Sequence, residues 1–255
     1  MYRCDDLAIV DELAASARRG INVQILMTQL APRGWDERLK DLANLLRNLG
    51  TDVRLYESSV MKYHDKYVVV DDAFALVTSA NLIRKSFETT CDYLLFTESP
   101  HIVEGLKKLF ENDFSTRALP FPHITDRFIV GPEGARQRLT EIIASARKSI
   151  DIIDRRLTDP QILELLKARA DDGVSVRIVG EQRTDGLTTH GRMILIDGQI
   201  AVLASMHLAA ASLDSRRELA IVLEDAPVVQ ELNAYFESLS AAGFSINSMR
   251  FPTGS

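Results

Sequence analysis

Cysteine is scarce in this sequence, with only 2 among 255 residues, Cys4 and Cys91. Two cysteines are too few for a disulfide framework, and these two show no spacing typical of metal ligands. The scarcity argues against a small disulfide-stabilised secreted domain and against a cysteine-based metal site. We therefore expect a reduced, cytoplasmic protein. Separately, no metal site is visible in the sequence, and no cofactor is expected.

Long apolar runs and an excess of positive charge are also missing. No window approaches the roughly 18 consecutive apolar residues of a membrane span, and no signal peptide is visible at the N-terminus. Acidic residues outnumber basic ones, 36 to 30, and the formal net charge is −6. This balance gives no general attraction to nucleic acid or anionic lipid. Nucleic acid is therefore the less favoured partner, whereas peripheral contact with a membrane stays open.

The most informative stretch runs from Tyr63 to Asp92. It consists of two short apolar runs joined by an Asp-Asp-Ala bend and flanked by polar residues. In chain order the polar residues are His64, Lys66, Asp71, Ser79, Asn81 and Asp92.

The same spacing begins again at His190. Counted from each histidine, the motif positions are +2, +7, +15, +17 and +28. At these positions the second copy has Arg192, Asp197, Ser205, His207 and Glu218. The chain has only 5 histidines, and two of them begin this pattern. The match therefore indicates an internal repeat.

Strand geometry predicts how the motif is arranged. Successive side chains of a strand point to opposite faces, so His64 and Lys66 point the same way. We expect Val68 and Val70 to continue that face inward. The Asp-Asp-Ala bend then returns the chain antiparallel and brings the Ser79 hydroxyl back toward the histidine.

Helices and strands alternate along both halves of the chain. In the first half we expect helices within 7–17, 35–49 and 102–110, and strands within 21–26, 53–56, 67–70, 75–77 and 93–96. In the second half we expect helices within 135–146 and 159–170, and strands within 128–130, 149–154 and 174–179. The alternation is typical of an α/β fold with much of its sheet parallel. The one proline-rich spot, 119–122, separates the predicted domains 1–119 and 120–255.

The two halves are not equally complete. Residues 6–26 align with 159–179 by a shift of 153, whereas the motifs align by a shift of 126. The second half is thus 27 residues shorter between these two regions, and it lacks a counterpart of the 35–49 helix. Conversely, the strand–helix–strand of residues 128–153 has no counterpart before Met1. Either the chain is a shortened form of a longer protein, which we favour, or its first domain is built differently. The smaller first sheet would need a cover at its edge, from another segment or from another copy in a homo-oligomer.

The doubled His-x-Lys-x4-Asp motif, with serine and asparagine following, resembles the phospholipase D superfamily over residues 5 to about 242. The resemblance implies two α/β domains related by a pseudo-two-fold axis, each a mixed β-sheet flanked by helices. It implies one active site where the motifs meet, and a two-step phosphodiester exchange without a metal.

The chemistry of phosphodiester cleavage fits this resemblance. It requires a nucleophile, a proton donor for the leaving oxygen, and positive groups on the non-bridging oxygens. His64 is our choice for a nucleophile that forms a phosphohistidine, and His190 is the acid and base. Lys66 and Arg192 would hold the phosphoryl oxygens. The expected phosphate-binding residues are Ser79, Asn81, Ser205 and His207. By position in the family, Asp92 and Glu218 orient the histidines, while Asp71 and Asp197 are structural residues of the hairpin turns.

The family pattern is nearly complete in the first motif and degenerate in the second. Arg192 replaces a lysine, His207 replaces an asparagine, and Thr78 and Ala204 replace the glycine before serine. Arginine keeps the charge but needs a different geometry, and His207 could either donate to phosphate or fill the pocket.

Three functions follow from these residues. We favour hydrolysis or phosphatidyl transfer on phospholipid head groups. The alternatives are a nuclease-type phosphodiesterase and a pseudoenzyme that binds phosphate without turnover. The residues that could line an apolar mouth, or equally pack in the core, are Met61, Tyr63, Tyr67, Met193 and Met206. The arginine pairs 18–19, 155–156 and 216–217 are interpreted as solvated faces.

Overall fold

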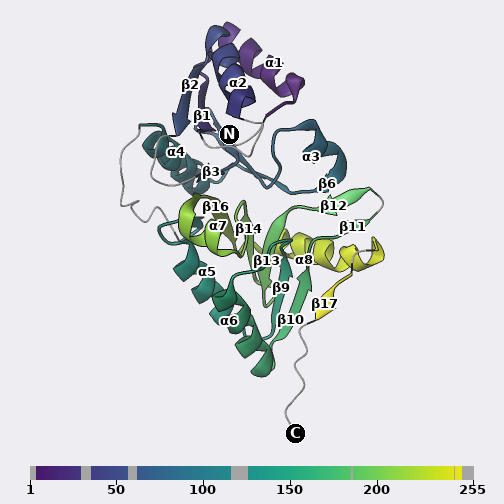
Figure 1. Ribbon diagram of the computed structural model, residues 1–255. Helices are drawn as coiled ribbons and strands as arrows, with labels where there is room; N and C mark the ends of the chain where they lie inside the picture. The colour runs from purple at the N-terminus through teal and green to yellow at the C-terminus, as the bar shows by residue number, and fades with distance from the viewer. Residues whose placement is uncertain are drawn as a thin grey trace.

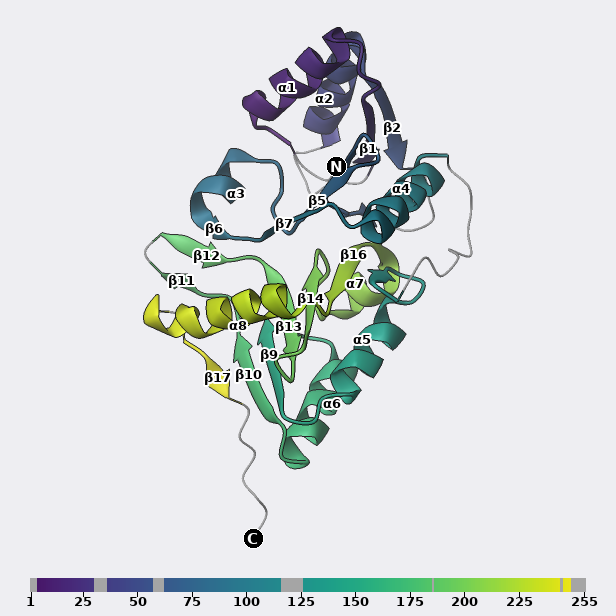
Figure 2. The same ribbon diagram turned by 180° about the vertical axis from the view of Figure 1, so that it is seen from behind.

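The structure, a computed structural model, describes residues 4–29, 36–56, 62–115, 126–184, 186–243 and 245–248. In Figures 1 and 2 the first half of the chain forms the upper part of the molecule and the second half the lower part. The predicted boundary at 119–122 lies outside the described residues, so the division into domains 1–119 and 120–255 stays a prediction. Among the described residues, no helix combines the length and hydrophobicity needed to cross a bilayer.

The elements follow the predicted alternation of helix and strand. Those of the first half are α1 (Leu7–Arg18), β1 (Gln24–Thr28), α2 (Asp36–Asn48), β2 (Asp52–Tyr56), β3 (Lys62–Tyr63), β4 (Tyr67–Val70), β5 (Phe74–Thr78), α3 (Arg84–Thr89), β6 (Thr90–Cys91), β7 (Leu94–Thr97) and α4 (Pro100–Phe114). Those of the second half are β8 (Phe128–Val130), α5 (Ala135–Ala144), β9 (Ser149–Ile153), α6 (Pro160–Asp171), β10 (Ser175–Val179), β11 (Arg183–Thr184), β12 (Leu187–Thr189), β13 (Arg192–Ile196), β14 (Ile200–Ala204), α7 (Ala210–Ser215), β15 (Arg216–Arg217), β16 (Leu219–Leu223), α8 (Ala226–Ala241) and β17 (Asn247–Ser248).

The equivalent helices α1 and α6 begin in the same way. Asp6 accepts hydrogen bonds from the backbone amides of Ala8 and Ile9, and Asp159 accepts them from Gln161 and Ile162. An aspartate at this position binds N–H groups that the first helical turn leaves unpaired. The shared cap supports the alignment of these two parts of the chain, which lie 153 residues apart.

The second half is built on a seven-stranded sheet of order β17-β10-β9-β13-β14-β16-β8. The central strand β9 runs parallel to β10 and antiparallel to β13. Helices α5 and α6 cover one face of the sheet, and α8 covers the other (Figure 2). The α5–α6 face contains Ile150, Ile152 and Ile194, all almost completely buried. Burial of each such side chain contributes about 1.5–3 kcal/mol to folding.

The described strands of the first half do not join into one sheet. Strands β1 and β2 form a parallel pair, and β4, β5 and β7 form a separate antiparallel sheet. Within the described residues, β8 and β9 have no counterparts in this half, and α2 has none in the second half. The predicted smaller first sheet is confirmed for these residues.

One prediction about the first sheet is wrong. Val68 was expected to point inward beside Val70, but 45% of its surface is exposed and Val70 is only half-buried. The strand alternates as predicted, but no described helix covers that face in the way that α5 and α6 cover the second sheet.

Candidate active site

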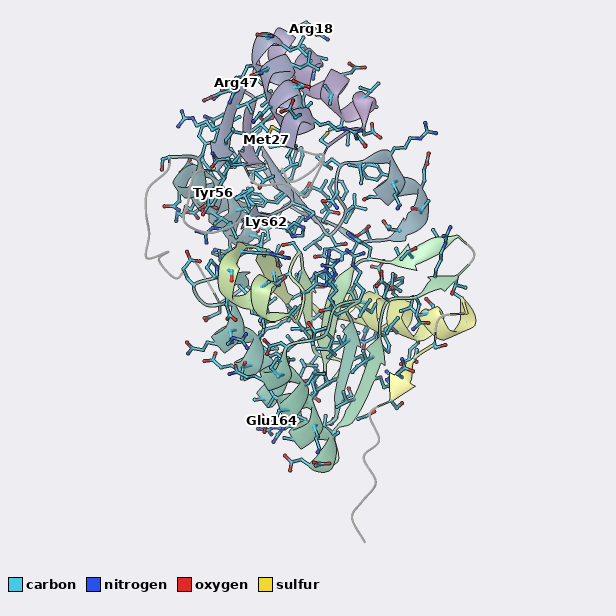
Figure 3. All side chains as sticks on the ribbon, in the orientation of Figure 1. Arg18, Met27, Arg47, Tyr56, Lys62 and Glu164 are labelled. Carbon is cyan, nitrogen blue, oxygen red and sulfur yellow. The ribbon has the colours of Figure 1, made fainter. Side chains whose placement is uncertain are left out.

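His64 lies in the link between β3 and β4, and a strand of the second half fixes its position. Strand β3 pairs in parallel with β15, and the His64 amide donates to the Arg217 carbonyl at 2.8 Å. The next residue after β15 is Glu218, whose Oε1 lies 2.7 Å from His64 Nδ1. Figure 3 labels Lys62, the first residue of β3, where the two halves of the molecule meet. The His64 ring is therefore held by a carboxylate of the other repeat.

His190 is positioned by the reciprocal arrangement, in which a strand of the first half fixes the residue of the second. Strand β12, which precedes it, pairs in parallel with β6, and the His190 amide donates to the Cys91 carbonyl at 3.2 Å. The next residue after β6 is Asp92, whose Oδ1 lies 2.7 Å from His190 Nδ1. Close approach is possible because Gly191 follows the histidine: a Cβ there would lie 3.3 Å from the Cys91 carbonyl oxygen.

The two carboxylates are thus exchanged between the repeats. Asp92 of the first repeat contacts His190, and Glu218 of the second repeat contacts His64. In both contacts Nδ1 faces the carboxylate, so the Nε2 atom of each ring points away from it. Neither histidine could be held this way by its own repeat alone.

The two cations of the motifs are buried beside the histidines. Lys66 Nζ lies 3.2 Å from His64 Nε2 and donates to the His64 carbonyl at 2.8 Å. An Arg192 Nη atom lies 2.8 Å from His207 Nε2. Burial, followed by the charge of Arg192, lowers the pKa of Lys66 to about 7, and burial lowers the pKa of Arg192. Crowded, desolvated positive groups of this kind are stabilised by an anion that binds between them.

Burial shifts both histidines toward the neutral form. Burial, and next the charge of Lys66, lower the pKa of His64 well below 6.5. Burial also lowers the pKa of His190, against an opposing hydrogen bond with Asp92. Burial raises the pKa of Glu218 to about 7, whereas hydrogen bonds from His190 and Ser79 outweigh burial and lower the pKa of Asp92. A neutral imidazole with its Nδ1 on a carboxylate is a suitable nucleophile or base.

Ser79 and Ser205 lie close to the histidines but contact protein groups. The Ser79 hydroxyl donates to Asp92 Oδ1 at 2.5 Å, and the Ser205 hydroxyl accepts from the Leu219 amide at 3.1 Å. Their predicted role in binding phosphate stays a prediction. The Ser79 contact supports Asp92, and the Ser205 contact holds Leu219, the residue that follows Glu218.

His207 belongs to a buried network of its own. Its Nδ1 lies 2.6 Å from Asp154 Oδ1, and its Nε2 contacts Arg192. Burial lowers the pKa of His207 to about 4, although Asp154 opposes this. The equivalent Asn81 has a buried Oδ1 without a hydrogen-bond partner among the described residues. Whether Asn81 and His207 bind phosphate stays a prediction.

Asp71 and Asp197 lie at the hairpin turns. Both have positive φ angles, 52° and 54°. Asp197 accepts hydrogen bonds from the backbone amides of Arg147, Lys148 and Ser149, which fixes the start of β9. Asp71 is exposed and makes no hydrogen bond to a described residue. This geometry is that of turn residues, as the sequence predicts.

Comparisons with known proteins show the family of this chain. The family model described as "Cardiolipin synthase, PLD-like domain" matches residues 1–114 and 182–240. The chain belongs to this family. The recognition of the phospholipase D superfamily from the doubled motif is confirmed.

Curated relatives of this PLD-like chain are cardiolipin synthases. "Probable cardiolipin synthase YwiE" of Bacillus subtilis (strain 168) is 24% identical, with 96% of this chain and 62% of that protein covered. "Cardiolipin synthase 2" of Staphylococcus epidermidis is 30% identical over 114 residues, with 44% of this chain and 23% of that protein covered. The chain therefore spans only part of the length of these relatives.

Two solved structures share the fold. Polyphosphate kinase from Porphyromonas gingivalis has a TM-score of 0.77 at 16% identity, with 97% of this chain and 43% of that chain covered. Phosphatidylserine synthase from Haemophilus influenzae Rd KW20 has a TM-score of 0.56 at 11% identity, with 95% and 85% covered. The α/β fold with two related halves is confirmed by these likenesses.

Two groups that sequence reasoning missed support the PLD-like site. Asp154 follows β9 and holds both His207 and the Leu208 amide, yet nothing in its sequence context signals contact across 53 residues. Asp65, directly after His64, is buried with neither carboxylate oxygen bonded to a described residue. Its position beside the motif histidine was the only available signal.

The interpretation of the arginine pairs needs correction. Arg217 is 3% exposed, lies 3.3 Å from Asp113 Oδ2 of α4, and donates to Glu133 Oε2 at 2.8 Å. It therefore ties the second half to the first instead of facing solvent. Arg155 is half-buried, with a pKa that burial lowers. Arg18 and Arg19 are exposed, as expected.

The suggested apolar mouth is also corrected for most of its residues. Tyr63, Met193 and Met206 are at most 3% exposed and pack in the core, and Tyr67 is half-buried. Met61 lies outside the described residues. Core packing, the alternative interpretation of these side chains, accounts for them.

Proposed function

We propose that this chain carries the catalytic constellation of a metal-independent phosphodiester exchange on phospholipid head groups. The observation that carries the proposal is the exchange of carboxylates between repeats, which leaves two histidines with matched orientation beside two buried cations. Such a site provides a nucleophile, an acid–base group and positive groups for non-bridging oxygens.

His64 is the proposed nucleophile. Its lowered pKa favours the neutral ring, and Glu218 at Nδ1 with Lys66 at Nε2 favours the tautomer whose Nε2 carries no proton. Nε2 attacks phosphorus to form a P–N bond while the P–O bond to the leaving alcohol breaks. His190, once protonated beside Asp92, gives its proton to that leaving oxygen.

The second step reverses the first with a new oxygen nucleophile. His190, now neutral, takes a proton from water or from an acceptor alcohol, and that oxygen attacks the phosphohistidine. The P–N bond breaks and His64 is restored. Water gives hydrolysis, and an alcohol gives phosphatidyl transfer. Lys66 and Arg192 would stabilise the charge on the non-bridging oxygens through both steps.

The lipid substrate is inferred from the family, since curated relatives are named as cardiolipin synthases. The charge balance, 36 acidic to 30 basic residues, agrees with this choice over a nucleic acid that a basic groove would follow.

The test uses purified chain 1–255 with phosphatidylglycerol dispersed in detergent, with and without EDTA. We expect release of glycerol or formation of a larger phosphatidyl product, unchanged by EDTA and abolished in His64→Ala. Single-stranded DNA, double-stranded DNA and RNA are assayed in parallel. Cleavage of a nucleic acid that depends on His64, with lipid untouched, would assign the nuclease function instead.

A phosphate-binding pseudoenzyme is the second candidate, and one observation favours it. The Arg192 guanidinium is already engaged by His207, which stands where the family pattern has asparagine. Crystals soaked in vanadate or tungstate distinguish the candidates when read with the assay. An anion bridging His64 and His190 without any turnover would support the pseudoenzyme, and an anion elsewhere would contradict the shared site.

A further inference from the structure

The three-stranded sheet of the first half has an exposed apolar face. Val68, Phe74, Leu94 and Phe96 are 45%, 42%, 53% and 70% exposed. The register places Val68 beside Leu76, and Leu76 beside Phe96, so these side chains form a continuous surface across β4, β5 and β7. Contiguous apolar patches of this kind mark binding surfaces in soluble proteins.

The equivalent face of the second half is covered. With the motif shift of 126, Val68, Leu94 and Phe96 correspond to Ile194, Ala220 and Val222. Those three residues are 5%, 0% and 3% exposed and belong to the cluster beneath α5 and α6. The same sheet face is therefore buried where the strand–helix–strand 128–153 is present and exposed where it has no described counterpart.

A gap in the sheet adjoins the exposed face. In the second half β9 lies between β10 and β13, whereas no described strand lies between their counterparts β1 and β4. A cavity of about 350 Å³ lies there instead. Its lining includes Ile9 and Leu13 of α1, Gln24 and Ile25 of β1, and Val68 and Val69 of β4.

Two polar residues at the cavity occupy positions equivalent to residues that hold the two ends of β9 in the second half. Asp197 accepts three backbone amides at the start of β9, and Asp71 keeps the same left-handed turn and lines the cavity. At the other end, Asp154 follows β9 and binds His207, whereas the equivalent Asn81 lines the cavity with its Oδ1 unpaired among described residues.

We propose that this cavity and the exposed face together bind a strand–helix–strand segment additional to residues 1–255, with the polarity pattern of residues 128–153. Its second strand enters between β1 and β4, parallel to the first and antiparallel to the second, and its helix covers Val68, Leu94 and Phe96. Main-chain hydrogen bonds give such strand addition its affinity, and side-chain pockets give it specificity.

The features of the cavity favour this occupant over a membrane or a second copy. A bilayer offers no amide donors for Asp71 and no strand to fit between β1 and β4. A second copy has its own 128–153 unit packed in its second half, with Ile150 and Ile152 fully buried. Neither alternative reproduces the two polar anchors.

The test adds such a segment to the chain and measures structure instead of activity, so it is independent of the proposed function. A copy of residues 126–153 is joined directly ahead of Met1, because the shift of 153 places residue 153 at the preceding position. Amide hydrogen exchange of Val68–Val70 and fluorescence of a hydrophobic dye are measured on the grafted and ungrafted chains. The matched control graft carries Ile152→Pro, which removes a ladder donor.

We expect the graft to slow exchange at Val68–Val70 by at least about tenfold and to remove most dye binding, while the proline graft does neither. Unchanged exchange and dye binding in the graft would overturn the proposal. So would a concentration-dependent dimer of chain 1–255 with β4 already protected, which would assign the face to a second copy. Binding of chain 1–255 to phosphatidylcholine vesicles, lost in Phe96→Glu, would assign it to lipid.

Substitution of Asp71 tests whether this residue anchors the added segment. Asp71→Ala should change the melting temperature of chain 1–255 by no more than about 1 °C but lower that of the grafted chain by several degrees. Asp197→Ala, which removes an anchor already in use, should lower both. Equal effects of Asp71→Ala in the two chains would contradict the predicted anchor.

Discussion

The two repeats differ in opposite ways: among the described residues, the first has the intact motif on a smaller sheet, and the second has the altered motif on a larger one. His64, Lys66 and Asn81 follow the family pattern above a three-stranded sheet, whereas Arg192 and His207 depart from it within seven strands. Both histidines nevertheless contact a carboxylate at 2.7 Å. The geometry of the histidines therefore depends on short strand pairs between the repeats, not on the size of either sheet.

The altered second motif depends on its larger sheet. His207 replaces asparagine and is held by Asp154, the residue that follows β9. Without β9 the ring of His207 would have no carboxylate in this place, and Arg192 would lose a well-oriented neighbour. The contact of His207 with Asp154 thus depends on β9, and no described strand of the first half places a carboxylate beside the equivalent Asn81.

The largest expected effect comes from removing either histidine. His64→Ala and His190→Ala should each lower turnover at least about 10³-fold, since one forms the covalent bond and the other moves the proton. Kinetics on phosphatidylglycerol measure this, with His101→Ala, an exposed histidine outside the repeat, as the matched control.

Trapping the phospho-enzyme then separates the two roles. We expect an acid-labile phosphate on the peptide that contains His64. A label on the His190 peptide would reverse the assignment, and the intact motif would no longer mark the nucleophile.

Arg192 should come next in effect. Arg192→Ala removes a charge-assisted contact to the transition state and should cost about 10²- to 10³-fold in kcat/KM, whereas Arg192→Lys should stay within about tenfold. The reciprocal Lys66→Arg in the first repeat serves as the matched variant. If Arg192→Ala equals the parent enzyme, the second motif takes no part in binding phosphate and the repeats are not functional partners.

The repeats also differ at the position after each histidine, Asp65 in the first and Gly191 in the second. Burial raises the pKa of Asp65 to about 8, with the charge of Asp113 adding to it. The folded state therefore holds this proton more tightly than the unfolded chain, and the stabilising contribution present at low pH is lost as pH rises from about 4 to 8.

Asp65→Asn should remove this pH dependence. At 1.36 kcal/mol per pH unit, the variant should gain on the order of 2–5 kcal/mol in unfolding free energy relative to wild type between pH 4 and 8. Urea unfolding across this range measures it, with the exposed Asp11→Asn as control. Parallel stability curves for Asp65→Asn and wild type would contradict the buried, protonated carboxyl.

Most helices and strands of this fold could be predicted from the sequence, because apolar spacing and turn signals depend on residues only a few positions apart. The helical spacing from Leu7 and the Asp6 cap indicated α1, and the offsets from His64 and His190 indicated both hairpins. The short helices α3 and α7 carry too few turns for a periodic signal. The exchange of Asp92 and Glu218 between repeats, and the contact of Asp154 with His207, depend on tertiary pairing that no sequence window contains.

The smallest expected effect is at Val68, and it measures how much burial of this sheet face contributes to stability. Val68 and Ile194 occupy equivalent places in the two sheets but are 45% and 5% exposed. Ile194→Ala should cost about 2–5 kcal/mol, because it removes buried methyl groups and leaves a cavity. Val68→Ala, on a face already in water, should stay within about 0.5 kcal/mol. Urea unfolding of both variants decides the comparison, and a cost at Val68 that matches the cost at Ile194 would mean that the first sheet is covered in solution even without an added segment.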